Sequence, residues 1–592
     1  MNSSRRLFSA ALAASALLAA VPVTAHAFDP TKDRETHLLS RSIDGSFPNG
    51  PSRDPVFAQN GQGASYIAFE SDASDIVAND PNGFTDVFVL RRGGHYTDTR
   101  GEPWQPDGAP LLVSRGIGGA PANGRSWGPD LDADAKHRSP HCVAFVSEAS
   151  NLVPGDTNGK ADAFVRDLRT GRIQRVSVAG RNRQSDGTTY DVKIDGACSR
   201  VAFTSDASNL YLSGKAAGRS KVKRPLRTPA PQAGTKQVYV RFLNNRLDDK
   251  NLKNVTWLAS SSKRRVPGAG NSYDVSFGRI GDGCPKRCGT DSGDSIAFTS
   301  DASNLGGRDG NGASDVYQKT FYLPTQTSRQ RRHHRKRIMR LNTLLISGTR
   351  SGRTGNGASS KPASNDDGEY VAFQTDATNL VPGDHNHATD ILLRGTFRDS
   401  RRMRMVSHAL ETGQANGPSY NPTITSPASI LFFESDATNL QPNPVSKRAH
   451  GHFYDRNCMR DIFFWNTVSG NASLQSRDSE QRIPNLPENT GAGVNAPCPA
   501  VIAEGSSNPA SSYYGNYFAF ESSYPLLDLD FEQTVIDHVE GVLASPLANP
   551  IAKWEQAARL SHDDPTLHQV YLRYNGPKSR DSHFPHSIWP KP

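Results

Sequence analysis

Hydrophobic residues in this chain come in short clusters, separated by stretches rich in Gly, Asn, Asp and Ser. One apolar phrase, an aliphatic residue, Ala and Phe followed by Ser or Thr and Asp, recurs seven times with small variations. Because each copy is short and β-prone, each predicts a buried strand followed by a turn. The copies begin at Ile67, Val143, Val201, Ile296, Val371, Leu431 and Phe518.

Three further strand types recur around the phrase. A strand with an aromatic residue or Leu at its third position follows it, beginning at Asp86, Asp162, Gln237, Asp315, Asp390, Asp461 and Gln569. The next strand, rich in Val, Ser and Leu, is expected at 111–114, 175–178, 257–260, 344–347, 405–407 and 473–476. The last type precedes the phrase and opens with a hydroxyl residue two positions before a polar or small one: Ser52/Asp54, Ser126/Gly128, Thr189/Asp191, Ser272/Asp274, Ser359/Lys361 and Ser419/Asn421, with Val494/Ala496 as a weak seventh. Four strands in each of seven units predict an all-β fold, a seven-bladed β-propeller of four-stranded blades.

The two ends of the chain are expected to meet in the last blade. The seventh unit ends after its third strand, at Tyr571–Tyr574, so its outermost strand is missing. Leu38–Ser42, near the start of the chain, matches that strand type. An N-terminal strand that completes the last blade would close the ring and leave no open sheet edge.

At this point the chain resembles the WD40-like (TolB/PD40) propeller repeats, in a long variant with the phrase SDASNLVPGDxNGxxDVF. Residues 143–166 carry that phrase almost complete, and the resemblance covers nearly the whole mature chain. It implies the propeller fold. It implies little about function, because such propellers serve as scaffolds, binding modules and companions of enzymes.

The N-terminus has the features of an export signal. Arg5 and Arg6 precede an apolar stretch at 7–23, and Ala25-His26-Ala27 is a small-x-small cleavage site, so residues 1–27 are expected to be removed before Phe28. The two arginines leave both the general secretory and the twin-arginine route open. No later segment has about 18 continuous apolar residues, so we expect an exported, periplasmic or extracellular protein without a transmembrane segment.

Composition adds a charge pattern and a set of cysteines. The 592 residues carry a net charge of +9, concentrated at 219–227 and 329–340, which are interpreted either as solvated loops or as contacts for an anionic partner. These runs lack interleaved aromatic residues, which disfavours nucleic acid. Six cysteines in an exported chain permit disulfides; Cys284–Cys288 is the pair expected, and Cys142–Cys198, at equivalent points of adjacent blades, is less favoured.

Five units carry Asp-x-Asn-x-x-x-Asp after the phrase strand, here called the Asp loops. Alternating oxygen ligands in a tight loop suit calcium, the one cofactor the sequence suggests, whereas the alternative is an Asx-turn that caps a hairpin without metal. The candidate ligands are Asp80, Asn82, Asp86, Asp156, Asn158, Asp162, Asp309, Asn311, Asp315, Asp384, Asn386, Asp390, Asp455, Asn457 and Asp461.

Two other patterns bear on possible chemistry. Gly124-Arg-Ser126-Trp-Gly128 matches the nucleophile elbow of serine hydrolases, but Ser126 also belongs to the recurring hydroxyl column, which accounts for it without catalysis. The residues two positions further along, Asp54, Asp191, Asp274, Lys361 and Asn421, are expected near the central channel. There they would bind a cation or a small polar ligand, or line a water-filled channel.

Three insertions interrupt the repeats, at 211–236, 322–340 and 524–567. The first and third are expected on the face of the Asp loops, and the second on the opposite face. The third has apolar residues at helical spacing, suited to a helix that packs on its blade or docks a partner: Phe531, Val535, Ile536, Val539, Val542 and Leu543.

These observations predict a monomeric binding scaffold whose partner is a protein or an envelope polymer. The alternative is a propeller enzyme that acts on a polysaccharide at the channel mouth, as a lyase or glycosidase. That chemistry needs paired carboxylates in one pocket. The sequence places Asp54, Asp191 and Asp274 on different blades, and no catalytic residue is assigned.

Overall fold

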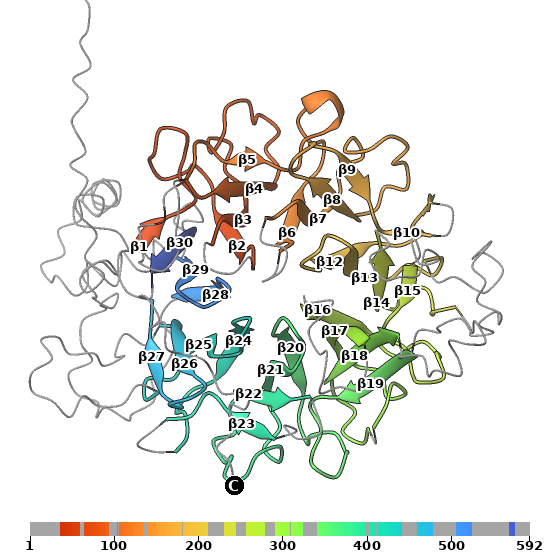
Figure 1. Cartoon of the computed structure of the whole chain (residues 1–592), viewed down its shortest axis with the longest axis vertical. Coiled ribbons are helices and arrows are strands. Elements are labelled where there is room, and N and C mark those ends of the chain that lie inside the picture. The colour runs from red at the N-terminus through yellow and green to blue at the C-terminus, as the bar shows by residue number, and fades with distance from the viewer. Residues whose placement is uncertain are drawn as a thin grey trace, which may run out of the picture.

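The computed structural model describes residues 36–59, 64–93, 104, 106–133, 139–179, 182–210, 230–243, 256–278, 291–307, 309–323, 340–396, 402–409, 413–440, 459–476, 505–523 and 568–574. These form seven four-stranded antiparallel sheets arranged as a ring, which confirms the predicted seven-bladed propeller (Figure 1). Within the described residues, no helix has the length and apolarity needed to cross a membrane.

In each of the first four blades the strands follow one another from the innermost, at the channel, to the outermost. Blade 1 contains β2 (Ser52–Phe57), β3 (Tyr66–Ser71), β4 (Asp86–Arg91) and β5 (Leu111–Leu112). Blade 2 contains β6 (Ser126–Leu131), β7 (Cys142–Ser147), β8 (Asp162–Asp167) and β9 (Ile173–Arg175). Blade 3 contains β12 (Thr189–Ile194), β13 (Arg200–Ser205), β14 (Gln237–Phe242) and β15 (Thr256–Leu258). Blade 4 contains β16 (Ser272–Gly278), β17 (Asp291–Ser300), β18 (Asp315–Leu323) and β19 (Arg340–Leu345).

The remaining blades follow the same order. Blade 5 contains β20 (Ser359–Ser364), β21 (Tyr370–Thr375), β22 (Asp390–Gly395) and β23 (Met403–Met405). Blade 6 contains β24 (Ser419–Ile424), β25 (Ile430–Ser435), β26 (Asp461–Asn466) and β27 (Ala472–Leu474). Blade 7 contains β28 (Ser506–Ser511), β29 (Tyr517–Ser522), β30 (Gln569–Tyr574) and β1 (Thr36–Leu38). A short hairpin, β10 (Val178–Ala179) and β11 (Arg183–Gln184), and a 3₁₀ turn at Ile117–Gly119 lie between blades.

The core lies between the two middle strands of neighbouring blades. The Phe of the repeated phrase is fully buried and, in six blades, stacks on the aromatic residue of the next strand, as Phe69 does on Phe88 at 5.7 Å between ring centroids. Blade 5 has Phe373 against Leu392 at this position. Stacked rings of this kind add to the burial of apolar area, so the recurring aromatic pair accounts for the regular blade.

The ring is closed by the N-terminal strand, as predicted, but with a different boundary. Thr36–Leu38 pairs antiparallel with β30, Leu38 opposite Tyr571, so β1 and β30 lie side by side (Figure 1). The strand was expected over Leu38–Ser42. It ends earlier because the chain turns after Leu39, whose N–H donates to Val570 O at 2.9 Å.

A buried serine explains why the outermost strands end before their predicted limits. In every blade its Oγ hydrogen-bonds the first side chain of the third strand and accepts the next backbone N–H, as Ser114 does with Asp86 and Val87. The serine therefore leaves the sheet, and β5, for example, ends at Leu112. The seven serines are Ser40, Ser114, Ser177, Ser260, Ser347, Ser407 and Ser476.

One innermost strand was placed wrongly. Blade 7 begins at Ser506, with Asn508 two positions later, and not at Val494/Ala496. Ser506 Oγ donates to Ser522 Oγ at 3.2 Å, the same hydroxyl pair that Ser52 forms with Ser71 at 2.8 Å. This pair needs a hydroxyl residue at the start of the strand, which Val494 lacks.

The disulfide preference was also wrong for one pair. Cys142, at the start of β7, is bonded to Cys198 in the turn between β12 and β13, with their Cα atoms 6.0 Å apart. The two residues meet because both lie where the first and second strands of neighbouring blades are joined, at the same end of the propeller. Both described cysteines are thus paired.

Several predictions fall outside the described residues. They are the signal at 1–27, the Cys284–Cys288 pair, Cys458, Cys498, the basic run 219–227, nearly all of 329–340, the apolar face within 524–567, and the Asp455/Asn457 half of the fifth Asp loop. The strands that flank residues 324–339, β18 and β19, end and begin on the side of blade 4 opposite the Asp loops.

Candidate functional site

The Asp loops lie on one face of the propeller, where the chain also enters each blade. Ser126, the first residue of blade 2, donates its N–H to Thr85 O in the Asp loop of blade 1 at 2.7 Å. This end of the propeller is called the Asp-loop face below.

The last Asp of each loop has a structural role. It begins the third strand, is fully or almost fully buried, and accepts the hydrogen bond from the serine described above. The central Asn closes an Asx-turn on the backbone N–H two residues later: 2.9 Å for Asn82 to Phe84 and 3.2 Å for Asn158 to Lys160. Its amide also reaches the next blade in three cases, as from Asn158 to Ser185 O at 3.1 Å. The turn interpretation therefore accounts for these two positions.

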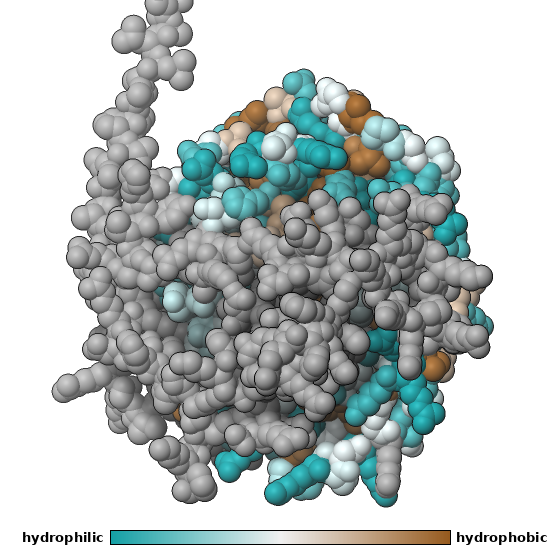
Figure 2. All heavy atoms as spheres, turned by 45° about the vertical axis from the view of Figure 1, so that its right-hand side comes forward, coloured by the Kyte–Doolittle hydropathy of each residue, from teal (hydrophilic) through white to brown (hydrophobic). Residues whose placement is uncertain are grey.

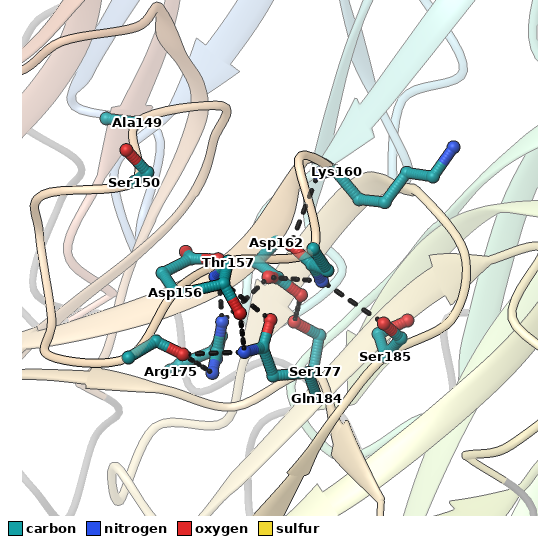
Figure 3. A network of polar contacts seen from close by, with 12 residues as sticks. Ala149, Ser150, Asp156, Thr157, Lys160, Asp162, Arg175, Ser177, Gln184 and Ser185 are labelled. Atoms are coloured by element: carbon teal, nitrogen blue, oxygen red, sulfur yellow. Dashed lines mark hydrogen bonds and ion pairs between the residues drawn. The ribbon is translucent and has the colours of Figure 1, made fainter.

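In blade 2 a guanidinium lies between the two carboxylates of the loop (Figure 3). Arg175 Nη1 is 2.9 Å from Asp156 Oδ1 and 3.3 Å from Asp162 Oδ2, and Nη2 is 3.5 Å from Gly155 O. The arginine side chain is only 9% exposed. An ion pair this well buried is screened little by solvent, so Arg175 offsets part of the negative charge of the two carboxylates within the loop.

Blades 1, 4 and 5 have the carboxylates without an arginine at the position of Arg175, although in blade 1 the charge of Arg115 opposes the rise that burial causes in the pKa of Asp80 and Asp86. Arg175 lies opposite Phe164 in the sheet, and the residues at the matching position are Leu112, Leu345 and Met405. In these blades buried carboxylate oxygens accept no hydrogen bond: Asp80 Oδ1, Asp315 Oδ2, Asp384 Oδ1 and Asp390 Oδ2. Buried polar atoms are nearly always bonded, and exceptions call for an explanation.

Burial and the neighbouring carboxylate raise the pKa of these acids. Desolvation, followed by the charge of Asp86, raises the pKa of Asp80 to about 6. Desolvation raises the pKa of Asp315 to about 7, with Asp309 adding to the shift, and that of Asp390 to about 6, with Asp384 adding to it. Each pair therefore resists carrying two negative charges.

Blades 3 and 7 replace the Asp loop by a glutamine. Gln237 Oε1 accepts the serine hydrogen bond at 2.7 Å, and its Nε2 donates to Gly268 O at 3.2 Å in the segment entering blade 4. Gln569 does the same with Ser40 and Gly50. One neutral side chain thus makes the contacts that Asp and Asn share elsewhere. Blade 6 keeps Asp461 on Ser476, and the rest of its loop is not described.

The predicted column at the channel mouth is confirmed as a shared position but differs in its contacts. Asp54, Gly128, Asp274, Lys361, Asn421 and Asn508 all have positive φ, at a bulge of the innermost strand. Asp191 does not, and its Oδ1 accepts the N–H of Thr204 at 2.9 Å in its own blade. Lys361 Nζ lies 3.2 Å from Asp274 Oδ1, so these two neighbours form an ion pair.

Three buried glutamates of blades 6, 7 and 1 were missed from the sequence. Glu434, Glu521 and Glu70 occupy the variable position of the repeated phrase, and each accepts the backbone N–H of the bulge in the next blade at 2.7 Å. Desolvation raises the pKa of all three above its usual range, and the negative charge of Asp54 adds to this for Glu521 and Glu70. The recurrence of Glu after Phe was the available signal, but its partner lies in another blade.

An acidic rim surrounds the mouth one strand further out. It is formed by the acid of the repeated phrase: Asp72, Glu148, Asp206, Asp301, Asp376 and Asp436. In blades 1, 2 and 6 this acid pairs with an arginine, as Asp72 does with Arg53 at 2.6 Å. In blades 3, 4 and 5 its partner is a hydroxyl, from Tyr190 at 2.9 Å, Tyr273 at 3.2 Å or Thr389 at 2.7 Å. A hydroxyl carries no charge, so the carboxylates of these three blades keep theirs.

Ser126 is placed as a structural residue. It is fully buried and donates to Ser147 Oγ at 2.9 Å. A second group, Asp132 with Cys142 and Cys198, has ligand atoms close together, but both sulfurs are in the disulfide and Asp132 Oδ1 accepts two backbone N–H bonds.

No protein-family model matches the chain, and no curated protein matches it. Similar solved structures include TolB from Acinetobacter baumannii, with 11% identity and a TM-score of 0.31 over 70% of this chain and 64% of TolB. An oligogalacturonate lyase from Vibrio parahaemolyticus has 9% identity and a TM-score of 0.38 over 92% of each chain. A puromycin-hydrolyzing peptidase from Mycobacterium tuberculosis has 10% identity and a TM-score of 0.34 over 83% of this chain and 61% of that one.

This chain therefore spans just under two thirds of the length of TolB. At these identities and scores the likenesses carry no argument about function. The propeller follows from the seven sheets of the chain itself, whereas the specific repeat variant stays a prediction.

Proposed function

We propose that this chain is an exported binding scaffold that holds a protein or an envelope polymer against its Asp-loop face. The observation that carries the proposal is the set of rim carboxylates on this face that are bonded to hydroxyls and not to arginine, Asp206, Asp301 and Asp376. Rim carboxylates and three buried glutamates converge on one channel mouth. The signal expected at residues 1–27 supports export.

The charge of the mouth favours a partner that presents cationic groups there. Asp206, Asp301 and Asp376 are bonded to hydroxyls and keep their charge on neighbouring blades. Neighbouring carboxylates attract ligands of the opposite charge and steer their approach. Among the coloured side chains in Figure 2, hydrophilic ones predominate.

The enzymatic alternative, a polysaccharide lyase or glycosidase, draws on a different observation. Glu70 and Glu521 have raised pKa values, and a protonated carboxyl is what a general acid requires. Both, however, are more than nine-tenths buried and hold the next blade through a backbone N–H. A structural use of the pair accounts for the same geometry, so we favour binding.

The test compares two variants of the mature chain as bait in envelope fractions. Asp206→Asn/Asp301→Asn/Asp376→Asn removes three rim charges, and Asp107→Asn removes an exposed charge at the opposite end of blade 1. We expect the parent and the control to retain the same partner at low salt, and the triple variant to lose about tenfold in affinity or more. Equal retention by the triple variant, or release of polysaccharide fragments by the parent, would contradict the proposal.

A further inference from the structure

The Asp loops of blades 1, 4 and 5 form a site that goes beyond the proposed function. The carboxylates come from the two ends of a seven-residue loop, Asp80 and Asp86 in blade 1, and the hairpin holds them together. Asp80 is 6% exposed and its Oδ1 has no donor. In blade 5, Asp384 and Asp390 are 3% and 0% exposed and each has one oxygen without a donor.

Blade 2 shows what such a pair needs. Its two carboxylates are bridged by a single nitrogen of Arg175, at 2.9 and 3.3 Å, and the same guanidinium approaches a backbone carbonyl, Gly155 O, at 3.5 Å. A positive charge thus lies among three oxygen atoms in blade 2, and blades 1, 4 and 5 keep the two carboxylates at the matching positions. The side chain that would reach this place is Leu112 in blade 1, Leu345 in blade 4 and Met405 in blade 5.

We propose that the carboxylate pairs Asp80/Asp86, Asp309/Asp315 and Asp384/Asp390 each bind a calcium ion in the position that the Arg175 guanidinium occupies in blade 2. The ligands shared by the three pairs are carboxylate oxygens, which a hard cation prefers. Water would supply the remaining ligands of an ion that takes six to eight.

Blades 3 and 7 fit this assignment. Each has the neutral Gln237 or Gln569 in place of the carboxylate, with its amide bonded to backbone carbonyls. No negative charge needs balancing there. The same position therefore holds a calcium ion in blades 1, 4 and 5, an arginine in blade 2 and a glutamine in blades 3 and 7.

Burial raises the pKa of Asp80, Asp315 and Asp390, but it also raises the pKa of Asp162 beside Arg175 to about 6, so these values do not separate blade 2 from the other blades. The alternative for these pairs is a shared proton in place of the ion. Calcium binding distinguishes the two, because a pair that holds a proton takes up no metal.

The test counts calcium ions by isothermal titration of the full mature chain, and it uses differences between variants. Arg175→Leu gives blade 2 the residue found in blade 1, so it should bind one calcium ion more than the parent. Leu112→Arg gives blade 1 the residue found in blade 2, so it should bind one fewer. Arg175→Lys keeps a positive charge and should leave the number unchanged.

Thermal unfolding keeps the test decisive if a variant folds poorly. Arg175→Leu should melt lower than the parent in EDTA and recover most of the difference in millimolar calcium, whereas Leu112→Arg should respond less to calcium than the parent. The proposal is overturned if the parent binds no calcium, if magnesium binds but calcium does not, or if both exchanges leave the number of ions unchanged.

Discussion

At the scale of single residues, different blades use different side chains to make the same hydrogen bonds at the start of the third strand. The first side chain of the third strand must accept a hydrogen bond from a buried serine, and another group must donate to the carbonyls that enter the next blade. Asp and Asn divide these tasks in blades 2, 4 and 5, and Gln237 or Gln569 performs both in blades 3 and 7. In these five blades the fold therefore needs one acceptor for the serine and one donor to the carbonyls, whether two side chains or one supply them.

Gln237→Glu should destabilise the protein strongly. The glutamate would lose the donor to Gly268 O and Gly270 O and would bury a charge, at a cost of about 3–5 kcal/mol in the free energy of unfolding. Gln374→Glu is the matched control, because Gln374 only accepts the N–H of Asn421 and other blades have Glu there. Urea unfolding measures both; equal losses would contradict this account of Gln237.

At the scale of elements, the closing strand and the disulfide hold neighbouring blades together. β1 covers the edge of β30, buries Leu38 at 3% exposure and brings Ser40 to Gln569. The disulfide joins the start of β7 in blade 2 to a turn of blade 3. Both connect parts of the chain that the repeats alone would leave as separate sheets.

Removal of residues 28–42 should open blade 7. The loss of the strand pairing, of the buried Leu38 and of the Ser40 hydrogen bonds is expected to cost about 3–5 kcal/mol and to expose a sheet edge. We expect a lower melting temperature and aggregation in size-exclusion chromatography. Removal of residues 28–35 alone should change neither, and the same stability for both truncations would show that β1 does not close the ring.

Replacement of Cys142 and Cys198 by serine should lower the free energy of unfolding by about 4 kcal/mol, the value expected for a 56-residue separation. The measurement is denaturant unfolding of the double variant against the parent under oxidising conditions. A parent that is as sensitive to denaturant as the variant would indicate that this bond does not form in solution.

Most of the fold could be predicted, because the repeated phrase combines hydrophobic pattern, turn residues and spacing in each blade. The third strands begin where expected, at Asp86, Asp162 and the five matching residues. The predicted outer strands were too long, because the spacing of hydrophobic residues does not show the hydrogen bonds by which the buried serine leaves the sheet. The Val494/Ala496 error arose beside a long insertion, where spacing gives no guide.

The candidate site was less predictable because its contacts cross blades. The Asp loops were recognised from their own residues, but Arg175 lies on another strand and its position opposite Phe164 depends on register. Glu70, Glu434 and Glu521 find their partners in the next blade. Contacts between blades cannot be read from the sequence of one repeat, because the two partners meet only in the folded ring.

At the scale of the whole molecule, many carboxylates converge on one face, so stability should depend on pH. Burial of Glu521 raises the pKa of its carboxyl from the ordinary 4.5 to about 8 in the folded protein. The protonated form therefore contributes stability that is fully present below pH 4.5 and is lost as the pH rises through the folded-state pKa.

Glu521→Gln keeps an acceptor for the N–H of Asp54 and removes the ionisation. Between about pH 5 and pH 8 its melting temperature should fall less than that of the parent, because the variant has no carboxyl at this place to ionise on unfolding. The comparison is made by thermal unfolding at both pH values in the same salt. A parallel fall in both proteins would assign the pH dependence to other groups.

At all three scales, a positive charge offsets the carboxylate pair of each Asp loop that is fully described, Arg175 in blade 2 and the proposed calcium ion in blades 1, 4 and 5. The most direct measurement is a crystal structure of the mature chain grown in calcium, with anomalous diffraction recorded at long wavelength. We predict anomalous density between Asp80 and Asp86, between Asp309 and Asp315 and between Asp384 and Asp390, and none beside Arg175. Density at none of the three pairs, or density beside Arg175 as well, would contradict the account.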